Sequence, residues 1–173
     1  MKKLMLFCLA ACLCACGGDP KEIKDISTYI TEVSDSMSAG KKVMVIKIKA
    51  SSQTTASRLI YSPANEMREI FPKMLKHFPD LDAEYIDFII LGDLVDKYGN
   101  SRLAPIIRLS FKMSDIKKIN FTQDFTPWRL LALVDEGYHL HPRVSHEAIT
   151  EYCNETDNKR YAAVFCNTAK SFK

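Results

Sequence analysis

The sequence predicts a single α+β domain, in which a small, mainly antiparallel sheet is packed with several helices. Two observations carry this prediction. Runs rich in β-branched residues, with alternating polar positions, predict strands near residues 42–50, 85–98 and 102–113. Apolar residues spaced by three and four predict helices in the segments around these strands. The chain contains no internal repeat that would point to a solenoid or a propeller.

The first predicted element is an amphipathic helix that begins after Asp19 and ends at Gly40. Asp19 is a good N-cap, Pro20 suits the first helical position, and Glu22 completes a capping box. Gly40 stands where a glycine commonly ends a helix. The apolar residues at helical spacing between these two ends are Ile23, Ile26, Ile30, Val33 and Met37.

The next part of the chain predicts a strand and then a second helix. Within residues 42–50, alternation directs Met44, Ile46 and Ile48 inward. Residues 51–57 form a polar loop, and residues 58–61 are expected to return as a short extended piece. Ser62-Pro63 then caps a helix that reaches residue 78, and Pro72 must kink it or split it in two.

Residues 85–113 predict a long antiparallel hairpin. Residues 85–91 are the strongest strand in the chain, and both of its faces are apolar enough to be covered, so the strand should be central. Gly92 suggests a bulge, and Gly99-Asn100 supplies turn residues before the returning strand. Pro105 should lie near an edge or an irregularity.

The last third of the chain predicts short helices. Ser114 should cap one, and Thr126-Pro127 should cap a largely buried one that ends at Gly137. Ser145 should cap a third helix that runs through Cys153, followed by a polar loop over residues 154–160. Residues 161–166 fit a strand or a helix equally well.

The N-terminus has the composition of an export signal. Lys2 and Lys3 precede an apolar run over residues 4–15, which is too short to span a bilayer. The sequence Leu13-Cys14-Ala15-Cys16 resembles the lipobox of bacterial lipoproteins, and a second candidate box ends at Cys12. The resemblance implies a signal peptide over residues 1–15, a lipidated Cys16 (alternatively Cys12) with a tether to residue 20, and one α+β domain over residues 21–173.

The resemblance also implies a location. A lipidated N-terminus would anchor the protein, through covalently attached fatty acids such as palmitate, to a membrane of the bacterial envelope. Gly17, where enteric lipoproteins of the inner membrane carry Asp, mildly favours the outer membrane, facing the periplasm or the surface. Removal of residues 1–15 leaves 22 basic against 21 acidic residues, a formal net charge of +1, with no basic stripe. Nucleic acid is therefore not expected as a partner.

Only Cys153 and Cys166 remain beyond the signal and the lipobox. An even pair in an exported protein predicts a disulfide, which would add roughly 3 kcal/mol of stability by the chain-entropy estimate. The alternatives are two buried free thiols or half of a metal site.

The sequence contains no recognisable catalytic or cofactor-binding motif, so no cofactor and no catalytic residue are predicted. The glycines beyond the tether are too scattered for a phosphate-binding loop, and no nucleophile elbow is present. The one chemical constellation is His139, His141 and His146 with Glu147 beside them, a weak candidate for zinc or copper.

The function expected from these observations is that of a non-enzymatic binding module. It would be held to the envelope by its lipid and would bind an envelope protein or an extracellular ligand of unknown identity. One alternative is an accessory subunit of an envelope secretion, conjugation or assembly machine. The other is a metal-dependent envelope hydrolase that uses His139, His141 and His146.

Overall fold

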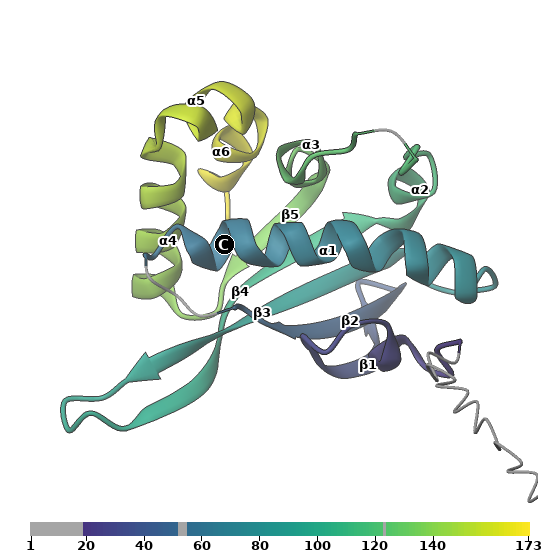
Figure 1. Cartoon of the computed structure of the whole chain (residues 1–173), viewed down its shortest axis with the longest axis horizontal. Coiled ribbons are helices and arrows are strands. Elements are labelled where there is room, and N and C mark those ends of the chain that lie inside the picture. Colours follow the sequence, from purple (N-terminus) through teal and green to yellow (C-terminus); the bar gives the residue numbers. More distant parts are fainter. Residues whose placement is uncertain (1–18, 52–54, 123) are drawn as a thin grey trace, which may run out of the picture.

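The computed structural model of the chain describes residues 19–51, 55–122 and 124–173. They form a five-stranded sheet with helices, so the predicted α+β class is confirmed (Figure 1). The strands are β1 (Ile30–Ser38), β2 (Lys41–Lys49), β3 (Tyr85–Val95), β4 (Ser101–Lys112) and β5 (Val134–His139). The helices are the short 3-10 helix η1 (Ile23–Ile26), α1 (Arg58–His77), α2 (Met113–Ile116), α3 (Pro127–Leu131), α4 (Pro142–Asn154), α5 (Thr156–Tyr161) and α6 (Ala163–Ala169). None of these helices combines the length and apolar character needed to cross a membrane.

The strands lie in the sheet in chain order, β1-β2-β3-β4-β5. Three of the four pairings are antiparallel, and β2 pairs with β3 in parallel. A parallel pair needs a crossover connection, which α1 provides by running across one face of the sheet (Figure 1). β3 is central, as its apolar sequence predicts.

The hydrophobic core lies between the helices and one face of the sheet, here called the covered face. The predicted inward residues Met44, Ile46 and Ile48 belong to this core. Phe71 of α1 packs edge-to-face on Phe88 of β3 and Phe111 of β4, with ring centroids 5.4 and 5.5 Å apart. Further along the covered face the core is closed by Leu130 and Leu131 of α3, Ala148 and Tyr152 of α4, and Phe165 and Ala169 of α6.

The prediction of a helix between Asp19 and Gly40 is wrong. Only η1 is helical there, and the chain then forms β1, which pairs with β2 through a two-residue turn at Ala39 and Gly40. Both turn residues have positive φ, 49° and 78°, as a type I′ hairpin turn requires. Residues 31–38 are rich in serine, threonine and aspartate, which compete with the helical backbone, so pairing with β2 is favoured over the helical spacing of the apolar residues.

The second helix is longer than predicted. α1 begins at Arg58, so the extended piece expected over residues 58–61 is absent, and α1 continues through Pro72 as one helix instead of two. The apolar side of α1 is fully buried on both sides of this proline, at Met67, Ile70 and Met74. The burial of these side chains outweighs the roughly 3 kcal/mol that an internal proline costs a helix.

The hairpin of β3 and β4 is confirmed, but the bulge is not at Gly92. Gly92 pairs regularly with Ala104, and the irregularity falls on β4 at Ile106, beside Pro105. The helix that starts at Thr126 is also shorter than predicted, because it ends at Leu131 and β5 follows it. The predicted cap is confirmed, since the Thr126 hydroxyl accepts a hydrogen bond from the Arg129 amide (3.4 Å).

Two further expectations for the C-terminal third are corrected, and the choice between strand and helix over residues 161–166 is decided in favour of helix. α4 begins at Pro142 and is capped by His141, not by Ser145. The expected loop over residues 154–160 contains α5, and residues 163–166 belong to helix α6. The buried side chain of Asn158 explains α5, because it donates to the carbonyl of Tyr152 (2.9 Å) and accepts from the indole N–H of Trp128 (2.7 Å). These partners come from other helices and leave no local signal in the sequence.

Candidate binding site on the open face of the sheet

The opposite face of the sheet, here called the open face, mixes polar side chains with apolar ones such as Val43 and Leu91, whereas the covered face is apolar. In the described chain, the helices contribute their buried side chains to the core on the covered face. Two polar residues are nevertheless buried in the middle of the open face, Asp87 of β3 (5% exposed) and Ser110 of β4 (6% exposed), which are register partners. They line a cavity of about 220 Å³ that also touches the β1–β2 turn and β5.

Asp87 and Arg108 form the charged centre of this cavity. Arg108 Nη1 lies 3.5 Å from Asp87 Oδ2, and the Asp87 side chain is 7% exposed. Burial raises the pKa of Asp87 above its ordinary value, and a hydrogen bond with Ser110 and the charge of Arg108 offset that effect only in part. The Nε–H of Arg108 is buried and has no hydrogen-bond partner within the described residues. An incompletely satisfied charged pair at the floor of a cavity is typical of a functional site.

Three cations line the cavity, Arg108 of the centre and two lysines, and each lies over a tyrosine ring. The Arg108 guanidinium is 3.7 Å from the ring centroid of Tyr138 on β5, and Lys173 Nζ is 5.4 Å from the same centroid. Lys41 Nζ is 4.6 Å from the ring centroid of Tyr85. Cation–π contacts of this kind hold the charges in place without neutralising them.

The carboxylates beside the cavity are already engaged. The hydroxyl of Tyr138 donates to Glu136 Oε2 at 2.5 Å, and this hydrogen bond holds the pKa of Glu136 below its ordinary value. Lys173 Nζ lies farther away, 3.7 Å from Glu136 Oε2. Glu136 is therefore an ionised acceptor whose closest donor is a neutral hydroxyl, not a cation.

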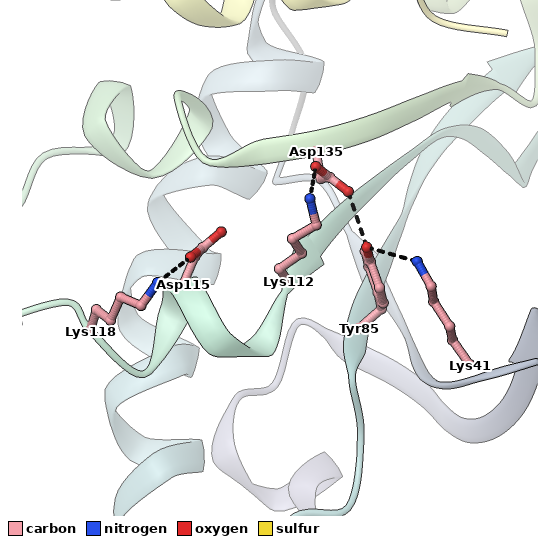
Figure 2. A network of polar contacts seen from close by, with 6 residues as sticks. All are labelled: Lys41, Tyr85, Lys112, Asp115, Lys118 and Asp135. Carbon is pink, nitrogen blue, oxygen red and sulfur yellow. Dashed lines mark hydrogen bonds and ion pairs between the residues drawn. The ribbon is translucent and has the colours of Figure 1, made fainter.

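A network across β2 to β5 borders the cavity (Figure 2). Lys41 Nζ donates to the Tyr85 hydroxyl (3.2 Å), and that hydroxyl donates to Asp135 Oδ2 (3.3 Å). Lys112 Nζ donates to Asp135 Oδ1 (2.6 Å). Because Lys41 is joined to a neutral hydroxyl while Lys112 takes the carboxylate, the charge of Lys41 is left without a direct counterion in this network.

The arrangement suits an oxyanion such as a carboxylate or a phosphate. Lys41, Arg108 and Lys173 line the cavity against two carboxylates, those of Asp87 and Glu136. Both carboxylates already have partners within the protein, Arg108 beside Asp87 and the Tyr138 hydroxyl on Glu136, so the cavity has more N–H donors than free acceptors. Arginine and lysine donors of this kind bind carboxylate and phosphate oxygens.

The three histidines of the proposed metal site do not converge as ligands. His139 Nδ1 is hydrogen-bonded to the buried hydroxyl of Ser145 (2.7 Å), and His141 Nδ1 accepts from the amide of Val144 (3.4 Å) at the start of α4. The rings of His139 and His146 are 5.7 Å apart. Over residues 19–51, 55–122 and 124–173 there is no group of three or more His, Cys, Asp or Glu side chains placed to hold a metal ion.

The predicted disulfide is confirmed. Cys153 at the end of α4 and Cys166 of α6 are bonded, with their Cα atoms 5.8 Å apart. The bond ties together two helices of the covered face, away from the cavity. The predicted lipidation site Cys16 and its alternative Cys12 lie outside the described residues.

Sequence reasoning missed the open-face site. The one available signal was Asp87, a carboxylate in the middle of the most apolar strand of the chain. Lys41, Arg108 and Lys173 are 65 or more residues apart and show no common spacing, so only the sheet brings them together. No protein-family model, curated protein or solved structure was found that matches this chain.

Proposed function

We propose that the chain is the non-enzymatic binding domain of a lipid-anchored bacterial envelope protein, and that its open face holds an oxyanion group of another envelope component. The observation that supports this most directly is the donor-rich cavity around Asp87 and Arg108. The likeness of residues 1–20 to a lipoprotein signal supports the location.

Burial of the Asp87 carboxylate lowers the stability of the fold, which favours a functional role for this residue. Its pKa is raised by burial, which means that the ionised carboxylate is disfavoured where it lies. An apolar side chain at this position would suit the rest of β3 better. In the proposed site Asp87 holds Arg108 in place from beneath, so that the remaining N–H donors of the guanidinium serve a ligand.

The size of the cavity limits what it takes. At about 220 Å³ it is smaller than the roughly 300–1,000 Å³ of pockets that enclose a whole drug-sized ligand. It suits one group, such as the carboxylate of a peptide or the phosphate of a lipid or polymer. The rest of the partner would lie along the open face.

An NMR titration of the isotope-labelled full chain in detergent micelles tests the site, with inorganic phosphate and acetate as the probes. The Nε–H of Arg108 is a suitable reporter, because it is buried and lacks a partner in the described structure. Both anions, or one of them, should shift this resonance. The variant Lys41→Gln should weaken the apparent affinity several-fold, since it removes a cation from the rim of the cavity.

The matched control is Lys118→Gln, which removes a lysine whose partner, Asp115, lies on α2 outside the cavity (Figure 2). It should leave the titration unchanged. A reporter that does not move with either anion, or a shift that Lys41→Gln and Lys118→Gln alter equally, would remove the basis for this site. A response to phosphate alone or to acetate alone would identify which oxyanion the partner carries.

A further inference from the structure

The hairpin of β3 and β4 extends beyond the sheet as an arm, defined here as residues 92–104. β2 makes its last contact with β3 where the Ala50 amide donates to the Leu91 carbonyl (3.0 Å). On the other side, the His141 amide donates to the Ile106 carbonyl (2.9 Å). Beyond these two bonds β3 and β4 pair only with each other, and the arm projects from the body of the molecule (Figure 1).

The tip of the arm has apolar side chains in water. Val95 is 68% exposed, Tyr98 is 77% exposed and Leu103 is 41% exposed. Val95 and Leu103 lie on the same side of the ribbon, since Val95 pairs with Ser101 and Leu103 pairs with Asp93. Lys97 lies over the ring of Tyr98, 4.8 Å from its centroid. A tyrosine flanked by aliphatic and basic side chains is the composition found where proteins meet the membrane interface.

Hydrogen bonds within the turn satisfy several backbone groups at the tip of the arm. The Asp96 carboxylate accepts from the amides of Tyr98 (2.8 Å) and Asn100 (2.9 Å), and from the side-chain amide of Asn100 (3.0 Å). The Gly99 amide donates to the Asp96 carbonyl (3.0 Å), and the Asp96 amide donates to the Asn100 carbonyl (3.0 Å). These bonds hold Tyr98 outward, and they satisfy several backbone groups of the turn within the protein, which lowers the cost of moving the turn into a less polar medium.

We propose that the tip of the arm, formed by Val95, Tyr98 and Leu103, inserts into the headgroup region of the membrane to which the protein is anchored. This rests on the anchor of the proposed function. If Cys16 is lipidated, three residues lie between it and Pro20, and the four steps along the chain span at most about 14 Å. The described chain therefore begins close to the membrane surface.

The positions of the two ends agree with a two-point contact. In Figure 1 the described chain begins (purple) at one end of the long axis, and the arm reaches the other end. Both lie on the side of the molecule away from α3, α5 and α6. A membrane along that side would meet both the tether and the arm tip, and it would hold the domain in one orientation.

The charges of the arm predict which lipids matter. Asp93 and Asp96 balance Lys97 and Arg102, so the formal charge of the arm is zero. Attraction to anionic lipid should therefore contribute little, and the contact should form on neutral phosphatidylcholine. The lipid anchor supplies the high local concentration that so small an apolar tip needs.

Depth-dependent fluorescence quenching tests the contact. The full chain, isolated from bacterial membranes with its lipid, is reconstituted into phosphatidylcholine vesicles with brominated acyl chains. In Tyr98→Trp, roughly half of the added tryptophan emission should be quenched relative to unbrominated vesicles. The chain has a single native tryptophan, Trp128, which provides the background.

The matched control is Val164→Trp, at a position of α6 that is 58% exposed. It should show no quenching, and Val95→Asp combined with Tyr98→Trp should reduce quenching at the tip. Equal quenching at both tryptophans, or none at Tyr98→Trp, would overturn the contact. If the tryptophan is not quenched but Tyr98 is still required for function in cells, the arm contacts a protein partner instead.

Fatty-acid labelling separates failure of the arm from failure of the anchor. The unsubstituted chain and Cys12→Ala should be labelled, and Cys16→Ala should not. A chain that is labelled but unquenched at Tyr98→Trp contradicts only the arm contact. A chain that carries no label contradicts the anchor and, with it, the arm contact that depends on it.

Discussion

The two faces of the sheet differ in how they are stabilised. On the covered face, Ile86, Phe88 and Ile90 of β3 are completely buried beneath the helices. On the open face of the same strand, Asp87 is almost as inaccessible, but it is buried by its neighbours in the sheet and by Arg108. Burial of apolar side chains stabilises the covered face, whereas burial of a charged group on the open face lowers the stability of the fold. That difference is why the open face is the better candidate for function.

The largest expected difference comes from Phe88→Ala. Phe88 packs edge-to-face against Phe71 and Phe111, at centroid distances of 5.4 and 6.1 Å. Its removal should lower the free energy of unfolding by about 3–5 kcal/mol, because it leaves a cavity in a packed core. Ile89→Ala, on the open face of the same strand, should cost about 1 kcal/mol. Urea unfolding monitored by circular dichroism measures both, and equal losses would contradict the distinction between the faces.

The second prediction concerns the charged centre. Arg108→Leu should destabilise the protein by about 1–3 kcal/mol at pH 7, because it leaves the buried Asp87 carboxylate without its counterion. The folded-state pKa of Asp87 is raised, so its protonation favours the folded state at low pH, and that benefit is lost as the pH rises through the folded-state pKa. Loss of Arg108 raises this pKa further. The deficit should therefore shrink as the pH falls towards the ordinary pKa of aspartate.

Denaturant unfolding at pH 7 and near pH 4 measures this deficit, and Lys118→Met is the control. Lys118 and Asp115 form an exposed ion pair, with 74% and 42% of their side chains accessible, so the unfolding midpoint should not change. A deficit for Arg108→Leu that is as large at pH 4 as at pH 7 would show that lost packing on Tyr138, not the charge of Asp87, is responsible.

The smallest expected effect is a gain at the β1–β2 turn, which borders the cavity. Ala39 has a φ of 49°, a left-handed conformation that costs alanine stability and suits asparagine. Ala39→Asn should raise the free energy of unfolding by about 0.5–1 kcal/mol, as measured by the thermal midpoint. Ala39→Val should lower it, because a β-branched residue fits this conformation poorly. No gain from asparagine would show that the turn is held by contacts other than its own backbone preference.

The predictions made from the sequence succeeded where local signals agreed. The alternation of β2, β3 and β4 was predicted correctly, because it extends over several residues with a defined period. The cap at Thr126 was also predicted correctly, from a threonine followed by a proline at the start of the helix. β1 and β5 were missed. β1 resembles a helix in its spacing, and β5 holds Gly137, where any larger side chain would collide with the ring of Phe172. Gly137 was interpreted from the sequence as the end of a helix, but in the structure this glycine leaves room for the ring of Phe172.

The amino-acid order alone was enough to predict the α+β class, the central hairpin and the pairing of Cys153 with Cys166. These depend on short-range periodicity and on the presence of just two cysteines after residue 16. The open-face site and the arm depend on tertiary structure. Lys41, Arg108 and Lys173 meet because strand pairing brings distant segments side by side, and the arm is exposed because β2 and β5 end before β3 and β4 do. No single segment of the sequence determines the register of a sheet or the relative lengths of its strands.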